Sequence, residues 1–313
     1  GFYRIKGNTS GMYLASGLAS NSKFAMSTAT DASTIFYFDG NTLTNYGSGQ
    51  ANGMTASAWA WVYGENASTV VFYDGLTNGG YAISSTSGTT GYFYDNGDNT
   101  ASADRGASVT ISGANARYTS WYLEEVTELP FTITAAGQAT LSLPVAWEVP
   151  AGVTVRYATT EHDGLLTLED TDVSAVAAGE AVILVGEAGD YTLSIATTGE
   201  ELGSILTSTG NTGVDVDATT KAYILAQNSE SQVVFALLND TERTIAAFKA
   251  YYISTASGDA PAFLLLDDGT VTGIDTVNAA AQNGAAVYDL QGRRVSKATK
   301  GVYIINGKKV LVK

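Results

Sequence analysis

Apolar and polar side chains alternate over short segments along residues 1–126, and clusters of Gly, Asn, Ser, Thr and Asp separate these segments. Alternation with a period of two is the pattern of a half-buried β-strand, and such clusters favour tight turns. No window in this region has a helical period. The pattern predicts strands at residues 2–6, 12–15, 23–27, 34–38, 59–63, 69–73, 81–84, 91–94, 108–112 and 119–124.

One segment is nearly duplicated within this region. Ser33–Gly40 reappears as Ser68–Gly75 at an offset of 35 residues, and Leu-Thr-Asn follows both copies. A weaker echo, Ser120–Glu125, comes 52 residues after the second copy. Three strand-and-turn units predict an all-β module built by internal repetition. Because the loops recur on a fixed core, repetition of this kind favours a binding function.

Short apolar segments continue after a boundary at Leu129-Pro130, spaced 8–15 residues apart with Gly and Asp-Gly turns between them. This spacing is typical of a β-sandwich, and Glu200–Thr207 is expected to form one short helical turn. The strands are predicted at residues 131–134, 139–144, 153–157, 165–168, 181–185, 191–195, 222–225, 233–238, 250–253 and 262–266.

The last part of the chain carries two hairpin signals, Gln291-Gly292 and Asn306-Gly307, between strand-like segments. Asn-Gly is the strongest short-range signal of a two-residue hairpin turn. A chain of 313 residues is long enough for two or three domains. We therefore predict an all-β protein with three domains: a repeated module, a β-sandwich and a C-terminal β-hairpin segment, over residues 1–126, 127–273 and 274–313.

The opening of the chain resembles a known family. Tyr3–Lys6 and Gly11–Leu14 resemble the start of a ricin-type β-trefoil repeat, and Trp121–Glu124 is similar to the Trp-bearing strand that ends such a module. The resemblance implies an N-terminal β-trefoil that binds carbohydrate, with Trp121 in its core. The Gln-x-Trp signature of lectin trefoils is absent from all three repeats. Trefoils without it also serve as protein-binding modules, so this alternative stays open.

Two further resemblances concern the location of the protein. Val287–Val295 and Lys300–Val312 closely resemble the C-terminal sorting domain of exported Bacteroidetes proteins. Segments around Pro150, Gly179 and Lys249 are similar to an accessory domain common in surface proteins of Bacteroides-type bacteria. These resemblances imply a secreted protein or one at the outer cell surface. The sequence begins with a strand-like segment and contains no signal peptide, so we expect a mature chain.

Composition excludes several functions. Cysteine is absent, which excludes disulfides, thiolate metal sites and thiol nucleophiles. His162 is the only histidine, and its neighbours Glu161, Asp163 and Gly164 predict an exposed turn. The net charge is −15, although residues 286–313 hold seven basic side chains and one acidic one. The acidic body disfavours nucleic acid as a partner, and no apolar run reaches the ~18 residues of a membrane span.

Two aromatic faces are the best candidates for ligand contact. Trp59, Trp61 and Tyr63 occupy alternate positions and share one face of a predicted strand, as do Tyr92 and Tyr94. Such a face stacks on sugar rings if it is exposed and belongs to the core if it is buried. Trp147 is expected to pack inside the sandwich. The predicted ligand-binding residues are Trp59, Trp61, Tyr63, Tyr92, Tyr94, Asp95 and Asp98.

Carboxylates give weaker signals. Asp95–Asn99, with Asp104 nearby, offer the oxygens that calcium prefers, but the EF-hand pattern is not matched and a turn explains them equally well. We expect no cofactor, with calcium as the alternative. Neighbouring acids such as Glu124 and Glu125, or Asp267 and Asp268, point to opposite faces of a strand and form no convergent catalytic pair.

The leading hypothesis is therefore an exported, non-catalytic protein that binds glycans or surface polysaccharide. The first alternative is a structural or adhesion protein that binds other surface proteins. The less favoured alternative is a glycan-acting hydrolase, which needs a cleft with two facing carboxylates.

Overall fold

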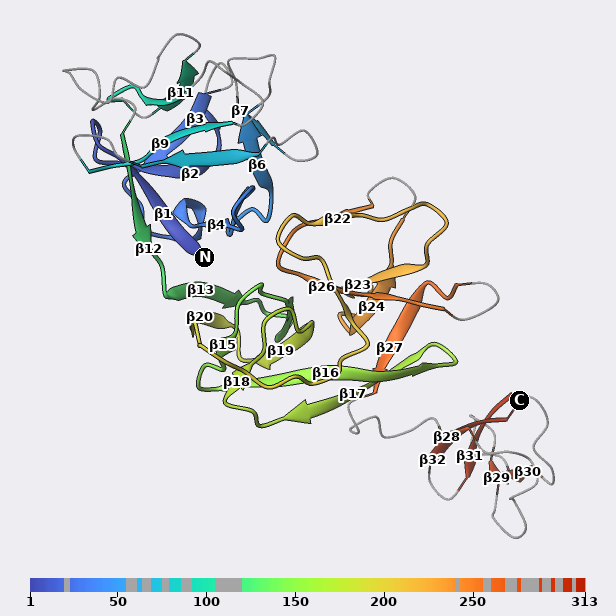
Figure 1. Cartoon of the computed structure of the whole chain (residues 1–313). Helices are drawn as coiled ribbons and strands as arrows, with labels where there is room; N and C mark the ends of the chain where they lie inside the picture. The colour runs from blue at the N-terminus through green and yellow to red at the C-terminus, as the bar shows by residue number, and fades with distance from the viewer. Residues whose placement is uncertain are drawn as a thin grey trace. The chain divides into compact units, whose positions relative to one another are not determined.

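The computed structural model is all-β, as the sequence predicts (Figure 1). Its described residues contain no α-helix and one 3-10 turn, Ala32–Thr34. The chain divides into two compact units, Gly1–Leu266 and Asp267–Lys313, and the three domain boundaries expected from the sequence stay predictions. The structure describes residues 1–19, 23–54, 61–63, 69–74, 79–85, 92–98, 100–104, 120–239, 243–255, 260–267, 275–276, 287–288, 294–295, 301–305 and 308–312.

Twelve strands form one sheet in residues 1–125, which we call the twelve-strand module, and they fall into three groups of four. The first group is β1 (Phe2–Gly7), β2 (Tyr13–Ala19), β3 (Lys23–Ser27) and β4 (Phe36–Phe38). The second is β5 (Leu43–Asn45), β6 (Ala51–Met54), β7 (Trp61–Tyr63) and β8 (Val70–Tyr73). The third is β9 (Ala82–Ser85), β10 (Tyr92–Asp95), β11 (Thr100–Asp104) and β12 (Trp121–Glu125).

The same pairing scheme recurs in all three groups. Each first strand pairs with its second, and each second strand with its third. The last strand of a group pairs with the first strand of the next group, and β12 returns to β1. Each last strand also meets the beginning of its own group, through the β1–β4 ladder, a hydrogen bond from Val70 N to Asn41 O, and a bridge between Tyr81 and Trp121.

The core of the twelve-strand module follows this repetition. The three first strands contribute Ile5, Leu43 and Ile83, and the three last strands contribute Phe36, Val70 and Trp121, each at most 1% exposed. Full burial of a large apolar side chain stabilises a fold by roughly 1.5–3 kcal/mol. The indole N–H of Trp121 donates to the carbonyl of Phe93, which confirms Trp121 as a core residue. The three sequence echoes contain β4, β8 and β12, the three last strands.

Residues 128–267 form a nine-stranded sheet and three two-stranded pairs: β13 with β20, β15 with β18 and β22 with β25. The nine-stranded sheet runs in the order β14-β19-β16-β17-β27-β24-β23-β26-β21. The helical turn expected at Glu200–Thr207 is wrong, because Glu200 bridges Val176 and the segment ends in a strand. The strands are β13 (Glu128–Ile133), β14 (Gln138–Leu141), β15 (Trp147–Glu148), β16 (Val153–His162), β17 (Leu165–Thr171), β18 (Ala175–Val176), β19 (Val182–Gly186), β20 (Gly189–Ser194), β21 (Thr207–Ser208), β22 (Val214–Asp215), β23 (Ala222–Gln227), β24 (Val233–Leu237), β25 (Thr244–Ile245), β26 (Ala250–Ile253) and β27 (Phe263–Asp267).

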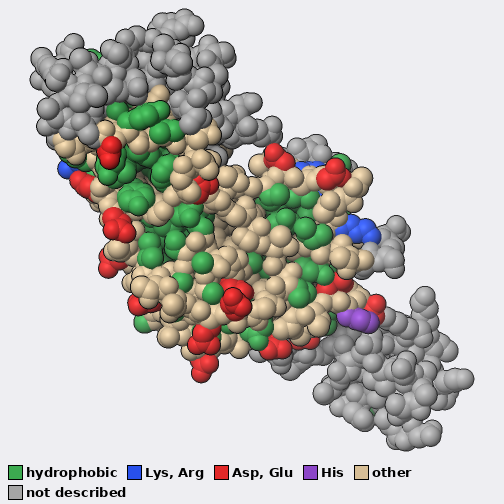
Figure 2. Space-filling model, viewed as in Figure 1, with side chains coloured by type: hydrophobic (Ala, Val, Ile, Leu, Met, Phe, Trp, Pro, Cys, Tyr) green, Lys and Arg blue, Asp and Glu red, His purple; other side chains and the backbone are tan. Residues whose placement is uncertain are grey.

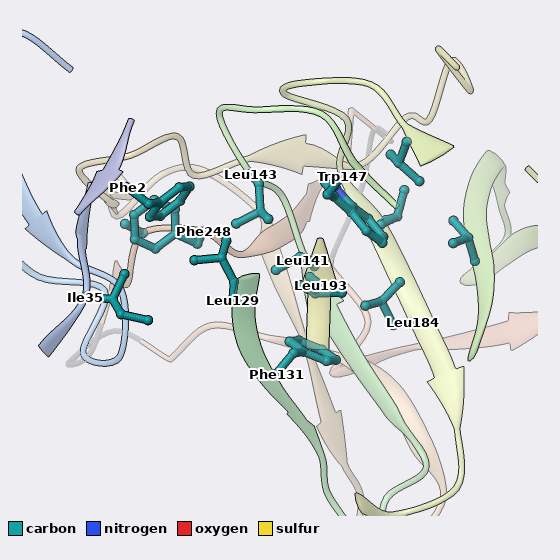
Figure 3. Packing of buried hydrophobic residues seen from close by; sticks show 14 of the residues in the cluster. Phe2, Ile35, Leu129, Phe131, Leu141, Leu143, Trp147, Leu184, Leu193 and Phe248 are labelled. Atoms are coloured by element: carbon teal, nitrogen blue, oxygen red, sulfur yellow. The ribbon is translucent and has the colours of Figure 1, made fainter. Parts of the chain in front are cut away.

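A shared hydrophobic core joins the twelve-strand module to these later strands. Phe2 and Ile35 belong to the same buried cluster as Leu129 of β13 and Phe248 (Figure 3). The ring of Phe2 lies 5.9 Å from the ring of Phe248, between centroids. Trp147 is fully buried in this cluster, which confirms that it packs rather than faces solvent. Among the described residues, this cluster spans the twelve-strand module and the later strands, beside three further buried clusters that are separate from it.

The second unit contains five paired strands. Its strands are β28 (Asp275–Thr276), β29 (Val287–Tyr288), β30 (Arg294–Val295), β31 (Gly301–Ile305) and β32 (Lys308–Val312). Val287 pairs with Val295, and Ile305 pairs with Lys308, as hairpins at both predicted positions require. The predicted turn residues themselves lie outside the described part of the chain, as does the predicted strand 108–112.

Candidate functional site

The carboxylate of Asp95, a predicted ligand-binding group, is fully buried at the end of β10. Its Oδ2 accepts hydrogen bonds from Thr9 N at 3.0 Å, Ser10 N at 2.7 Å and Ser10 Oγ at 3.0 Å. Its Oδ1 accepts one from Gly97 N at 3.0 Å. A β-carbon at Gly7 would overlap this carboxylate, so the end of β1 requires glycine. Asp95 thus holds the β1–β2 turn against the third strand group.

The other predicted site residues are placed as follows. Trp61 pairs with Met54 and Tyr63 with Asn52, across β7 and β6, but their side chains lie outside what the structure describes. The same holds for the side chain of Tyr92 in β10, and Trp59 lies wholly outside the described residues. Tyr94 is partly exposed next to Asp95, and Asp98 is exposed in the following turn. Tyr94 and Asp98 are the predicted residues that the structure describes at the surface.

The candidate metal and acid–base groups do not converge within the described residues. No group of three or more His, Asp or Glu side chains there is arranged to hold a metal ion. His162 is exposed in the β16–β17 turn, as predicted, with its Nδ1 3.4 Å from the Asp163 carboxylate. Asp163 adopts a φ of 52°, the left-handed conformation that suits Asp in a tight turn.

An aromatic row that the sequence analysis missed leads from the core of the twelve-strand module to its surface. Phe38 and Phe72 have ring centroids 4.8 Å apart, and Phe72 and Tyr81 6.2 Å apart, both in edge-to-face geometry. Such pairs contribute about 0.5–1.5 kcal/mol each beyond their burial. Tyr81 is 36% exposed. The row therefore ends in an aromatic ring that faces solvent. Tyr73 is also exposed, but it follows Phe72 directly on β8 and so points to the opposite face of the strand.

The backbone of Tyr81 is fixed as firmly as its ring. Tyr81 N donates to Trp121 O, and Trp121 N donates to Tyr81 O, both at 2.8 Å. The sequence did carry a signal for this row. Phe38 and Phe72 of the row both lie within two residues of Asp-Gly in the two copies of the duplicated segment, so the duplication repeats a phenylalanine near the strand end.

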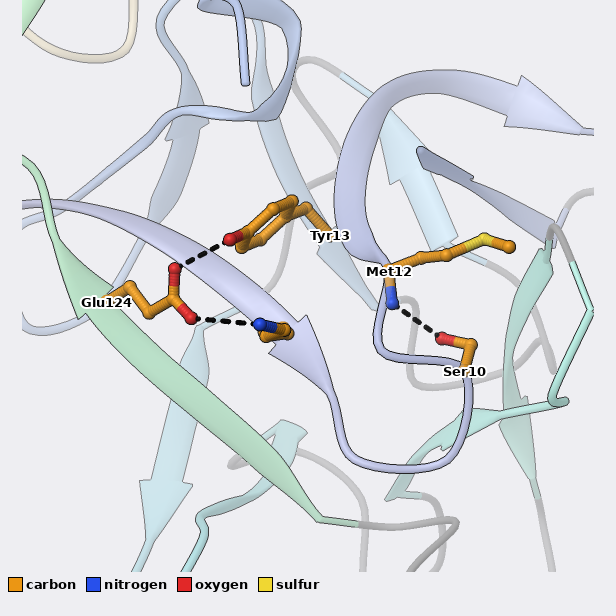
Figure 4. Close-up of polar contacts among 5 residues, drawn as sticks. Ser10, Met12, Tyr13 and Glu124 are labelled. Carbon is orange, nitrogen blue, oxygen red and sulfur yellow. Dashed lines mark hydrogen bonds and ion pairs between the residues drawn. The ribbon is translucent and has the colours of Figure 1, made fainter. Parts of the chain in front are cut away.

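A polar cluster links three strands on the same module (Figure 4). Glu124 of β12 accepts hydrogen bonds from the hydroxyl of Tyr13 at 2.7 Å and from Nζ of Lys6 at 3.4 Å. The Lys6 ammonium also lies 5.4 Å from the centroid of the Tyr13 ring. The hydrogen bond to the Glu124 carboxylate raises the pKa of Tyr13. Glu124 thus binds the Lys6 ammonium and the Tyr13 hydroxyl in a solvent-exposed polar network.

Acidic side chains are spread over the visible face of the molecule, and basic ones are few (Figure 2). Within the described residues, no helix has the length and apolar character that crossing a membrane requires. Comparison of the chain with protein-family models and with curated proteins finds no match. The site itself must therefore support any functional conclusion. The exposed ring of Tyr81, which Phe72 and two backbone hydrogen bonds hold in place, is suited to contact a flat apolar ligand face.

Proposed function

We propose that this protein is a secreted or surface-located, non-catalytic binding protein, and that its twelve-strand module is a β-trefoil that binds carbohydrate. Support for the trefoil comes from the pairing scheme that recurs three times and returns from β12 to β1. Support for the location comes from the resemblance of Val287–Val295 and Lys300–Val312 to a sorting domain. The following strands 128–267 are proposed to be a β-sandwich accessory domain.

The observation that carries the proposal is the exposed ring of Tyr81 at the end of the aromatic row. The apolar face of a sugar ring stacks on an aromatic ring, and the phenol hydroxyl gives it a polar partner. Because Tyr81 is held by Phe72 and by two backbone hydrogen bonds, binding costs little ordering of this side chain. The carboxylate of Asp95 has no place in the contact, since it is buried. A single site of this kind is weak, and display of many copies raises its avidity.

A glycan array probed with the full chain tests this proposal. We expect retention on a subset of glycans, and about twofold to thirteenfold weaker binding after Tyr81→Ala, as the loss of ~0.5–1.5 kcal/mol of aromatic contact predicts. Tyr157→Ala is the matched control, because Tyr157 lies on β16, outside the twelve-strand module. Equal binding by the Tyr81→Ala variant, or no retention of the unmodified protein on any glycan, would contradict the proposal.

A second candidate function is the binding of another surface protein. Phe263 and Leu265 of β27 occupy alternate positions, so they share a face of the strand, and they are 46% and 43% exposed. Large exposed apolar groups mark protein interaction surfaces. The glycan array and a Phe263→Ser variant separate the two functions. This candidate would be favoured if no glycan on the array retains the protein and if a protein partner binds the unmodified chain but not the Phe263→Ser variant.

A further inference from the structure

A cavity of about 250 Å³ lies where the loop after β5 meets the segment between β25 and β26. Its apolar wall contains Phe131, Leu141 and Phe248, and its polar lining includes Tyr46 and Lys249. Ligand pockets in proteins commonly have volumes of roughly 300–1,000 Å³ and form between packed structural elements. This cavity lies just below that range, which suits a compact ligand.

The cavity wall is held in an uncommon backbone conformation. Phe248 has a φ of 64°, in the left-handed region that bulky residues rarely adopt. Its N–H donates to Gly210 O at 3.0 Å, and its carbonyl accepts from Ser142 N at 3.1 Å. The adjacent Ala247 N donates to Gly49 O at 2.9 Å, which fixes the opposite wall. Strained residues of this kind concentrate at ligand sites, where the surrounding structure maintains them.

Tyr46 and Lys249, which each carry a hydrogen-bond donor at the end of the side chain, line the cavity. Among the described residues, no protein group forms a hydrogen bond or ion pair with the hydroxyl of Tyr46 or the ammonium of Lys249. Burial raises the pKa of Tyr46, so its phenol keeps the proton that it can donate. Lys249 keeps an exposed surface, while desolvation by the surrounding protein lowers its pKa. A phenol and an ammonium both donate hydrogen bonds, and both bind an anionic acceptor well.

We propose that this cavity binds a small carboxylate whose body is aromatic or branched aliphatic. The carboxylate accepts hydrogen bonds from Tyr46 and Lys249, and the body packs on Phe131, Leu141 and Phe248. This site is separate from the exposed tyrosines of the twelve-strand module. Its existence does not depend on carbohydrate binding.

Calorimetric titration of the full chain with phenylacetate, isovalerate and the neutral isostere phenylacetamide tests the site. We expect at least one acid to bind saturably, and phenylacetamide to bind at least about tenfold more weakly than phenylacetate, as the loss of a charge-assisted hydrogen bond predicts. Lys249→Met should weaken acid binding by a similar factor, and Tyr46→Phe should weaken it less while keeping the ring that packs on Phe2.

Lys221→Met is the matched control, because this substitution removes the same positive charge at a residue outside the cavity lining. Circular dichroism and thermal unfolding should show that each variant keeps the fold. No saturable binding of either acid, equal affinity for phenylacetate and phenylacetamide, or unchanged affinity in Lys249→Met would each overturn the proposal.

Discussion

Replacement of Asp95 by Ala should destabilise the twelve-strand module. The carboxylate accepts four hydrogen bonds, from the backbone amides of Thr9, Ser10 and Gly97 and from the Ser10 hydroxyl. The variant leaves these donors without their acceptor at a position that is fully buried. Asp95 would then be a residue of the fold and not of a ligand site, contrary to its prediction as a ligand-binding residue.

The magnitude follows from the hydrogen bonds. A hydrogen bond to a charged group contributes about 1.5–3 kcal/mol, but removing the carboxylate also removes the cost of burying its charge. Thr9 and Ser10 are only half-buried, so water reaches some of the freed amides. A net loss of about 2–4 kcal/mol is expected, which is a large part of a typical unfolding free energy of about 5–15 kcal/mol. Asp95→Asn keeps one acceptor oxygen and should lose about half as much.

Urea unfolding gives the loss of stability, and amide hydrogen exchange at Thr9 and Ser10 locates it. Asp74→Ala is the control, because Asp74 is an exposed carboxylate on the same module and should change the unfolding free energy by less than about 0.5 kcal/mol. A change below about 1 kcal/mol in Asp95→Ala, with unaltered exchange at Thr9 and Ser10, would refute the structural role of this carboxylate.

Three further predictions concern packing, acid stability and the shared core. Gly199→Ala should lower the unfolding free energy by at least about 2 kcal/mol, because a β-carbon there overlaps the backbone of Val176. Gly189→Ala is the control in thermal unfolding, because a β-carbon at Gly189 meets open space. Partial burial raises the pKa of Asp39, but hydrogen bonds from the amides of Thr42 and Asn41 and from Asn211 outweigh it and lower the pKa overall. Asp39 therefore stabilises the fold above its unfolded pKa of about 3.9, and this contribution is lost as the pH falls through the lower folded pKa. Asp39→Asn should therefore reduce the loss of unfolding free energy that is measured as the pH is lowered through this range. Phe248→Ala should cost about 3–5 kcal/mol by emptying a buried aromatic position next to Phe2, seen as a lower urea midpoint, and a loss under 1 kcal/mol would contradict the shared core.

Strong alternation made some strands easy to predict from the sequence. The strands predicted at residues 2–6 and 23–27 lie within β1 and β3, and the strand at 131–134 overlaps β13. Exposed and buried side chains alternate along β13, and buried side chains recur at every second position in β3. The hairpin signals of residues 287–312 also matched the observed strand pairing. In these segments the local pattern and the tertiary environment agree, which is why periodicity is sufficient.

Other features depend on contacts that are distant in the sequence. Strand β5 was not predicted because Thr44 and Asn45 are polar, yet both are fully buried. The Asn45 amide donates to the carbonyls of Ser33 and Ile35, which satisfies a polar strand in a way that no local pattern reveals. Strand β6 was missed because its Asn52-Gly53 pair is typical of a turn.

The candidate site was harder to predict for the same reason. The environment of Asp95 is set by Thr9 and Ser10, which lie 86 and 85 residues earlier in the chain. The aromatic row assembles from Phe38, Phe72 and Tyr81, which belong to three different segments. A sequence shows which aromatic residues exist, but the pairing of β4, β8 and β9 determines which of them reach the surface.

The central claim is that the exposed Tyr81 of the twelve-strand module holds a sugar ring. The most direct measurement is a nuclear magnetic resonance titration of the full chain with a glycan that the array retains, with the tyrosine rings assigned by single Tyr→Phe variants. The account predicts saturable shifts of the Tyr81 ring signals and no conversion of the glycan. Unmoved Tyr81 signals, shifts confined to Phe263 and Leu265, or the appearance of a cleaved sugar would contradict it.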